Sequence, residues 1–170
     1  MTDLAGEQVV LRPPTEADVA TLAAIRSTPE VHARWGGPLG GMEAKVRESM
    51  HEDGVTGYAV TVGGDVVGWI QCDDSGDPDT WYAGIDVYLA PHVHGRGLGT
   101  DAVRTLARHL VEDLGHHRLV IDPAADNEAA IASYRKVGFR PVGVMRRYER
   151  GPDGTWHDNL LMELLADELT

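Results

Sequence analysis

A glycine-rich run near the middle of the chain has the composition of a phosphate-binding turn. It comprises His94, Gly95, Arg96, Gly97, Leu98, Gly99 and Thr100. An expected strand at 81–89 precedes the run, and apolar residues spaced three and four apart predict a helix over 102–114 after it. Backbone N–H groups at the start of such a helix attract anions, so the run predicts a site for a phosphate or pyrophosphate.

The run differs from two common nucleotide-binding loops. Gly99-Thr100 lacks the lysine that closes a P-loop. The glycines alternate, and they come well into the chain rather than after a first strand as in a dinucleotide-binding fold. The pyrophosphate of coenzyme A is the third option, and a second segment at 127–139 favours it.

Together, the two segments resemble the GNAT superfamily of acetyl-CoA-dependent N-acetyltransferases. The family's loop reads Arg/Gln-x-x-Gly-x-Gly/Ala. Gly97 and Gly99 supply its glycines, whereas His94 stands where the family usually has Arg or Gln. The family's later helix reads Asn-x-x-Ala-x-x-x-Tyr-x-Lys-x-Gly-Phe. Its residues are matched here by Asn127, Ala130, Tyr134, Lys136, Gly138 and Phe139. The resemblance extends over about 7–166.

The resemblance implies roles for several of these residues. Acetyl-CoA is the implied co-substrate, with its pyrophosphate on the run 94–100. Pantetheine and the thioester carbonyl are implied to contact the backbone N–H groups of three strand residues, Val87, Tyr88 and Leu89. Asn127 is implied to hydrogen-bond the coenzyme arm, and Tyr134 to protonate the departing thiolate. The alternative for Tyr134 is a half-buried aromatic side chain on an amphipathic helix, and the motif favours the catalytic role.

Asp86 is the candidate base. It stands in the middle of an otherwise apolar expected strand, where a carboxylate is costly unless it is paired or used. An ordinary aspartate, with a pKa of about 3.9, is a weak base. Asp86 would therefore take a proton through water or hold the ammonium group of the substrate. The alternative is a structural ion pair with an arginine.

Further motifs look like the aminoglycoside 6′-N-acetyltransferase branch of the superfamily. They are Arg12-Pro13, Trp35-Gly36-Gly37, Ile70-Gln71, Gly84-Ile85-Asp86, Gly97-Leu98-Gly99-Thr100 and Asp122-Pro123. In that branch the aspartate matching Asp86 is the proposed base. The resemblance also implies that Trp35, Gln71 and Asp122 line the aminoglycoside pocket. The same resemblance implies that Asp158, near the last expected strand, is a further acidic wall of that pocket.

The charge of the chain favours a cationic partner. Its formal net charge of −12 argues against nucleic acid, whose phosphates attract clustered Lys and Arg. Four acidic residues crowd the segment before the central strand, namely Asp73, Asp74, Asp77 and Asp79. Asp73 is counted among the substrate-binding residues, because carboxylates form charge-assisted hydrogen bonds with ammonium groups. A solvated acidic turn is the alternative.

The remaining patterns predict a single α+β domain over 1–170. Expected strands at 8–12, 58–62, 66–71, 81–89, 118–121, 142–150 and 155–165 give a mixed central sheet of about seven strands. Helices are expected on both faces, as in the GNAT fold. Thr15 with Asp18 predicts a capping box, Gly63-Gly64 a hairpin turn, and Asp126 the cap of a helix over 127–136.

Several classes of protein are disfavoured. No apolar run approaches the roughly 20 residues of a membrane span, and no signal peptide is visible, so a cytoplasmic protein without membrane contact is expected. The single cysteine, Cys72, cannot form an internal disulfide, and we interpret it as a small apolar strand residue rather than a nucleophile. His92 and His94 lack a third ligand at metal spacing, so no metal is expected. A monomer or a homodimer is compatible with the sequence.

The leading hypothesis is acetylation of the 6′-amine of aminoglycosides by direct transfer from acetyl-CoA in a ternary complex. A second hypothesis is acetylation of another amine, such as a siderophore lysine, a polyamine or a protein N-terminus. A third is a non-catalytic domain that binds acetyl-CoA for regulation.

Overall fold

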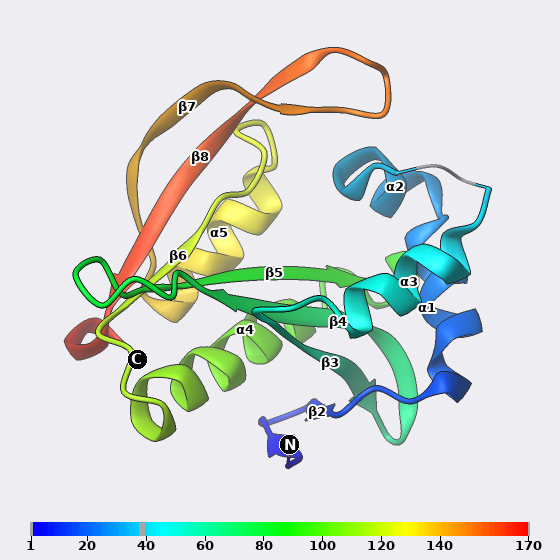
Figure 1. The fold of residues 1–170 in the computed structure, drawn as a ribbon, viewed down its shortest axis with the longest axis horizontal. Coiled ribbons are helices and arrows are strands. Elements are labelled where there is room, and N and C mark those ends of the chain that lie inside the picture. Colours follow the sequence, from blue (N-terminus) through cyan, green and yellow to red (C-terminus); the bar gives the residue numbers. More distant parts are fainter. Residues whose placement is uncertain (1, 38–39, 170) are drawn as a thin grey trace.

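One mixed β-sheet runs through the whole molecule (Figure 1). The computed structural model describes residues 2–37 and 40–169. The eight strands lie in the order β1-β2-β3-β4-β5-β6-β8-β7. Their bounds are β1 (Leu4–Ala5), β2 (Val10–Arg12), β3 (Val55–Val62), β4 (Asp65–Asp74), β5 (Ala83–Leu89), β6 (Arg118–Ile121), β7 (Arg140–Arg150) and β8 (Trp156–Leu165). The expected α+β architecture is confirmed.

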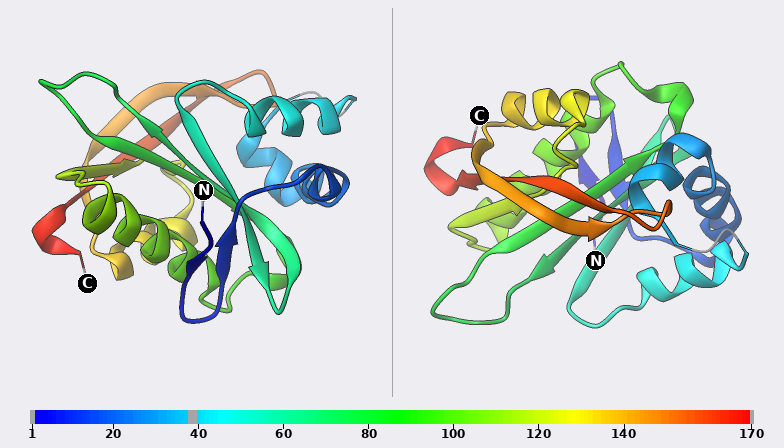
Figure 2. Two further views of the ribbon diagram at one scale, coloured as in Figure 1. Left: turned by 60° about the horizontal axis from the view of Figure 1, so that its bottom comes forward. Right: turned by 90° about the horizontal axis from the view of Figure 1, so that it is seen from above.

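Five α-helices flank the sheet in two groups (Figures 1 and 2). They are α1 (Val19–Arg26), α2 (Pro29–Trp35), α3 (Met42–Met50), α4 (Leu98–Arg108) and α5 (Glu128–Val137). Helices α1 to α3 lie together beside β3 and β4, whereas α4 packs on β5 and on α5. None of the helices within 2–37 and 40–169 is long and apolar enough to cross a membrane.

The strand count exceeds the expected seven because Leu4–Ala5 forms an additional short strand, β1, which pairs with β2. The first expected strand, 8–12, is also shorter than predicted, since β2 begins at Val10. Trp81 and Tyr82 precede β5 instead of belonging to it. The capping box of Thr15 and Asp18 is confirmed.

The pairing of β5 with β6 is short and decides where a cleft can form. The two strands are parallel, and only Ala83 with Leu119 and Gly84 with Val120 are in register. On its other side β5 pairs with β4 over its full length, from Ala83 to Leu89. The second half of β5 therefore has β4 on one edge and no strand on the other, so the sheet splays there.

A buried carboxylate ties the N-terminal segment to α4. Asp101 is 4% exposed, and its two oxygens accept hydrogen bonds from the backbone N–H groups of Glu7, Gln8 and Val9 at 3.0, 2.7 and 3.0 Å. These bonds replace strand pairing for the three residues, which is why β2 starts late. Charge-assisted bonds of this kind are stronger than bonds between neutral groups.

Asp101→Ala is expected to lower the free energy of unfolding by about 3 kcal/mol, because three backbone donors lose a charged acceptor. Urea unfolding monitored by circular dichroism measures the change. Asp53→Ala, which removes an exposed carboxylate from a turn, is the matched control and should leave stability nearly unchanged. Equal stability of the two variants would show that the Asp101 bonds contribute little.

Candidate functional site

A cleft of about 890 Å³ opens where β5 and β6 separate. Its walls come from α2, the second half of β5, the glycine-rich run, the segment after β6, α5 and β7. Most of the expected site residues line it, namely Trp35, Asp86, Val87, Tyr88, Leu89, His94, Gly95, Gly97, Leu98, Gly99, Thr100, Asp122, Asn127 and Tyr134. The exposed Arg96, together with Gln71, Asp73 and Asp158, is not among its lining residues.

One end of the cleft is built from backbone donors. Gly95 and Gly97 have φ angles of +74° and +81°, which side-chain-bearing residues rarely adopt, and Gly97 is the N-cap of α4. The first N–H groups of a helix, here those of 98–100, have no acceptor within it. The geometry therefore fits a bound phosphate or pyrophosphate.

The free edge of β5 presents selected backbone groups to the cleft. Trp35 Nε1 donates to the carbonyl of Val87 at 3.3 Å, and His94 Nε2 contacts the carbonyl of Leu89 at 2.8 Å. Because backbone groups alternate along a strand, the N–H groups of Val87 and Leu89 point to the same side as these carbonyls. The two carbonyls therefore have hydrogen-bond partners, and the N–H groups of Val87 and Leu89 remain as donors toward the cleft. The N–H group of Tyr88 points the other way, toward β4.

The structure assigns His94 a contact that the sequence did not suggest. The resemblance places this position at the pyrophosphate, but the ring nitrogen reaches back to the carbonyl of Leu89. The backbone N–H groups of the glycine run are therefore the groups available to bind an anion.

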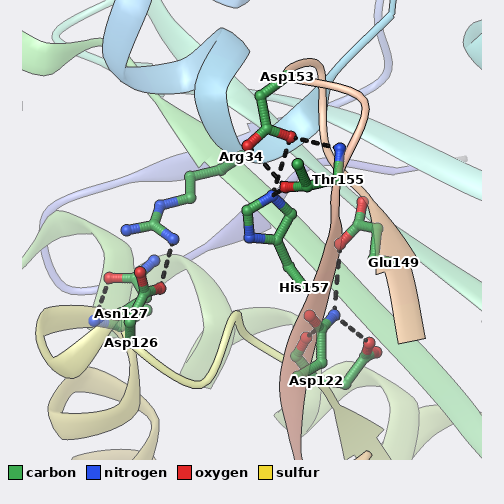
Figure 3. Close-up of polar contacts among 10 residues, drawn as sticks. Arg34, Asp122, Asp126, Asn127, Glu149, Asp153, Thr155 and His157 are labelled. Carbon is green, nitrogen blue, oxygen red and sulfur yellow. Dashed lines mark hydrogen bonds and ion pairs between the residues drawn. The ribbon is translucent and has the colours of Figure 1, made fainter. Parts of the chain in front are cut away.

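The cap of α5 differs from the prediction. Asn127, and not Asp126, is the N-cap, and its Oδ1 accepts from the N–H of Ala130 at 3.3 Å. Asp126 forms an ion pair with Arg34 of α2, with 2.6 Å between Oδ1 and Nη1 (Figure 3). Capping uses Asn127 Oδ1, so its amide NH₂ is the group that a ligand in the cleft could meet.

Tyr134 lies in the cleft wall on α5 and is 8% exposed. Burial raises the pKa of its hydroxyl well above the ordinary range, and the negative charges of Asp86 and Asp122 raise it further. The hydroxyl is therefore protonated at neutral pH and can serve as a proton donor.

Asp86 has an amide rather than an arginine as its hydrogen-bond partner. It pairs in register with Gln71 of β4, whose Nε2 donates to its Oδ2 at 3.4 Å. Trp69 Nε1 donates to Gln71 Oε1 at 2.8 Å and thereby orients the amide. The side chain is accessible through the open cleft, yet protein surrounds it on most sides. Burial, with the charges of Asp122 and Asp73, raises the pKa of Asp86 to about 6.

The acidic segment before β5 divides into two parts. Asp73 lies opposite Gly84 and contributes to the raised pKa of Asp86. Asp74 and Asp77 instead accept hydrogen bonds from backbone N–H groups of their own loop, at 2.8 and 2.9 Å. These two carboxylates shape the turn, as the alternative interpretation expected.

A second group of polar side chains lines the cleft, namely Asp122 after β6, Glu149 on β7 and Asn159 on β8. Asn159 Nδ2 lies 3.0 Å from Asp122 Oδ2 and 3.3 Å from Glu149 Oε2 (Figure 3). Sequence analysis missed Asn159 and Glu149, and selected Asp158 instead. The carboxylate of Asp158 accepts from the backbone N–H of Arg147 at 2.7 Å and stays outside the cleft lining. Adjacent strand residues face opposite sides, so Asn159, and not its neighbour Asp158, lines the cleft.

Trp35 is fixed by its neighbours. Its ring meets that of Tyr88 edge to face at 4.8 Å, and the guanidinium of Arg26 lies 5.2 Å from its centre. Trp35 therefore forms a rigid apolar wall of the cleft. Within 2–37 and 40–169, no group of three or more His, Cys, Asp or Glu residues is placed to hold a metal ion.

Comparison with known proteins identifies relatives of this chain. Residues 8–140 match the family described as "Acetyltransferase (GNAT) domain". The chain is 30% identical over 164 residues to the aminoglycoside N(6')-acetyltransferase type 1 of Klebsiella pneumoniae, covering 87% of this chain and 80% of that protein. The solved structure of AAC(6')-Ib in complex with ribostamycin and coenzyme A is 29% identical, with a TM-score of 0.77 and coverage of 95% of this chain and 96% of that one. The N-alpha-acetyltransferase RimI of Mycobacterium tuberculosis is 36% identical over 89 residues, covering 52% of this chain and 54% of that protein.

The raised pKa of Asp86 predicts a pH-dependent cost in stability. Its protonated form favours the fold, so the wild-type protein should lose stability between about pH 4, the ordinary pKa, and about pH 6, its pKa in the fold. Asp86→Asn should not show that loss and should be the more stable protein at pH 7. Urea unfolding at several pH values measures the difference. Asp53→Asn is the exposed control, and parallel curves for wild type and Asp86→Asn would contradict the raised pKa.

Proposed function

Because this chain belongs to the GNAT acetyltransferase family, we propose that it acetylates the 6′-amine of aminoglycosides directly from acetyl-CoA. The juxtaposition of two chemically opposite ends in one cleft carries the proposal. Backbone donors of the glycine run suit an anionic coenzyme, and carboxylates beside Asp86 suit a cationic acceptor. The 30% identity to an aminoglycoside N(6')-acetyltransferase supports the choice of acceptor.

The proposed coenzyme site consists of the free edge of β5 and the glycine run. When bound, acetyl-CoA supplies the acetyl group as a thioester. The N–H groups of Val87 and Leu89 are placed to donate to a carbonyl oxygen on which negative charge develops, and such donors are typically worth about 3 kcal/mol each. The N–H groups of 98–100 hold the pyrophosphate, and Asn127 hydrogen-bonds the coenzyme arm.

Two side chains move protons in the proposed reaction. The Asp86 carboxylate accepts a proton from the acceptor ammonium, directly or through water, which leaves a neutral amine as nucleophile. With its pKa raised to about 6, it is a stronger base than an ordinary aspartate and is still ionised at neutral pH. Tyr134, whose hydroxyl is protonated at neutral pH, donates its proton to the sulfur as the C–N bond forms and the C–S bond breaks. The second proton, which the acylated nitrogen loses, returns through water to the tyrosinate.

The second candidate is acetylation of another amine, including a protein N-terminus. The similarity to RimI favours it, although that similarity covers 52% of this chain. The acidic groups of the cleft favour a small polycation over a peptide with a single amine.

The glycine run is testable by a pair of matched substitutions. Gly97→Ala should raise the KM for acetyl-CoA at least tenfold, because alanine disfavours the φ of +81° by roughly 1–2 kcal/mol and turns the donors away. Gly64→Ala places the same strain in a hairpin turn, at φ +94°, and should change stability but not this KM. If both variants raised the KM for acetyl-CoA equally, backbone strain in general would explain the change, and not the N–H donors of the glycine run.

Thiol release from acetyl-CoA tests the reaction and its regiochemistry. Aminoglycosides with a 6′-amine should be turned over, whereas counterparts with a 6′-hydroxyl should not. Asp86→Asn and Tyr134→Phe should each lower kcat by 10²- to 10⁴-fold, the usual contribution of general acid–base groups, while acetyl-CoA binding is retained. Tyr58→Phe, a change in the buried core of β3, is the control. Turnover with other amines alone would favour the second candidate.

A further inference from the structure

We propose that Trp69 is a positioning residue for Asp86 and acts on it through the side-chain amide of Gln71. Trp69 and Gln71 lie on β4 with one residue between them, so their side chains share one face of the sheet. Asp86 lies opposite Gln71 on β5. The inference rests on the proposed function, because the state of the Asp86 carboxylate matters for turnover only if Asp86 is the base.

The indole of Trp69 decides which end of the Gln71 amide meets Asp86. Its Nε1 donates to Gln71 Oε1 at 2.8 Å, and an indole nitrogen donates but does not accept. The amide oxygen is therefore held toward Trp69, and the NH₂ group is directed at Asp86, with 3.4 Å between Nε2 and Oδ2. If the amide were turned round, donor would face donor at one end and acceptor would face acceptor at the other. The indole therefore excludes the orientation in which Gln71 would repel the carboxylate.

A glycine on the neighbouring strand makes room for this indole. Gly57 of β3 pairs in register with Gln71, on the side of β4 away from Asp86. A Cβ atom at position 57 would collide with Cζ2 and Cη2 of the Trp69 ring. The ring thus occupies the space that a side chain at position 57 would need, and Trp69 is only 2% exposed. Close packing of this kind leaves the indole little freedom to turn, so its donor stays fixed.

The hydrogen bond from Gln71 opposes surroundings that favour the protonated acid. The titratable groups that interact electrostatically with Asp86 come from β4, the segment after β6, α5 and β7, namely Asp73, Asp122, Tyr134, Tyr148 and Glu149. Burial raises the pKa of Asp86, the three carboxylates add to that rise, and the hydrogen bond from Gln71 lowers it. The two hydroxyls have a raised pKa and carry no charge at neutral pH. Gln71 is therefore the neighbour that favours the ionised base.

Trp69→Phe tests the role, because it keeps an aromatic ring and removes the N–H donor. The Gln71 amide is then free to turn away from Asp86, and the pKa of Asp86 should rise by roughly one pH unit from about 6. The acidic limb of kcat/KM against pH should move upward with it. Relative to wild type, kcat/KM should fall about fivefold where half of the wild-type Asp86 is ionised and hardly at all in alkaline solution. Carboxyl-labelled aspartate followed by ¹³C NMR measures the same pKa without turnover.

A second substitution shows whether Trp69 acts through the amide. Gln71→Met removes the amide at a half-buried position and keeps the length of the side chain, so it should raise the pKa of Asp86 with little risk to the fold. The double variant Trp69→Phe/Gln71→Met should raise it no further than Gln71→Met alone. Trp81→Phe is the matched control. It removes an indole donor that lies 2.9 Å from a different carboxylate, that of Asp74, and should leave the acidic limb unchanged.

The outcomes separate this inference from the proposed function. If Asp86→Asn left turnover unchanged, the proposed base would be wrong, whereas the NMR measurement would still report whether Trp69 acts on Asp86. If Asp86→Asn lowered kcat but Trp69→Phe changed neither the acidic limb nor the pKa of Asp86, the inference would be wrong and the proposed function would stand. Additive effects of the two substitutions would also overturn it. If Trp69→Phe does not fold, benzothienylalanine at position 69, with sulfur in place of N–H and the same ring shape, provides the same test.

Discussion

The short pairing between β5 and β6 is the constraint from which the site follows. Two residue pairs hold the strands together before they separate, so the rest of β5 has an edge without a strand partner. Unpaired backbone groups inside a protein are costly. Trp35 and His94 satisfy the two carbonyls at this edge, and the N–H groups of Val87 and Leu89 are left facing the cleft. The separation of β5 from β6 thus creates the cleft and leaves the N–H groups of Val87 and Leu89 as donors in its wall.

One end of the cleft favours an anion, and the other end favours a cation. The start of α4 presents N–H groups to an anion, whereas Asp86, Asp122 and Glu149 present carboxylates without arginine or lysine partners among the described residues. Burial, together with the proximity of these carboxylates, raises the pKa of Asp86 and of Asp122 and so costs stability in the empty protein. Such costs are common at functional sites, since the ligand supplies the missing charge.

The sequence predicted those parts of the site that depend on local structure. The glycine run, its helix and the strand carrying Asp86 are consecutive, so spacing and turn chemistry were sufficient. Asn159 and Glu149 could not be found in this way, because their position depends on how β7 and β8 pair. That register shifts between Met145 and Glu149, and a shift of one residue exchanges the two faces of a strand. The same long-range dependence hid the contact of Asp126 with Arg34, whereas the contact of His94 with Leu89 is local and was missed because the resemblance placed His94 at the pyrophosphate.

In the proposed function, the coenzyme and the acceptor are bound by different parts of the chain. Backbone groups of β5 and α4 face the coenzyme, and their directions are set by the fold itself, so they tolerate wide variation in side chains. Side chains of β5, β7 and β8 face the acceptor, and each can change without moving the backbone donors. At position 94 the resemblance expects arginine or glutamine, and this chain has histidine. This difference fits the division, because the His94 ring contacts the carbonyl of Leu89 while the backbone N–H groups remain for an anion. Chains that share this fold at low sequence identity can therefore keep one acyl donor and differ in the amine they accept. In the proposed function, the choice of acceptor therefore depends on cleft side chains such as Asp86 and Asp122 more than on the glycine run.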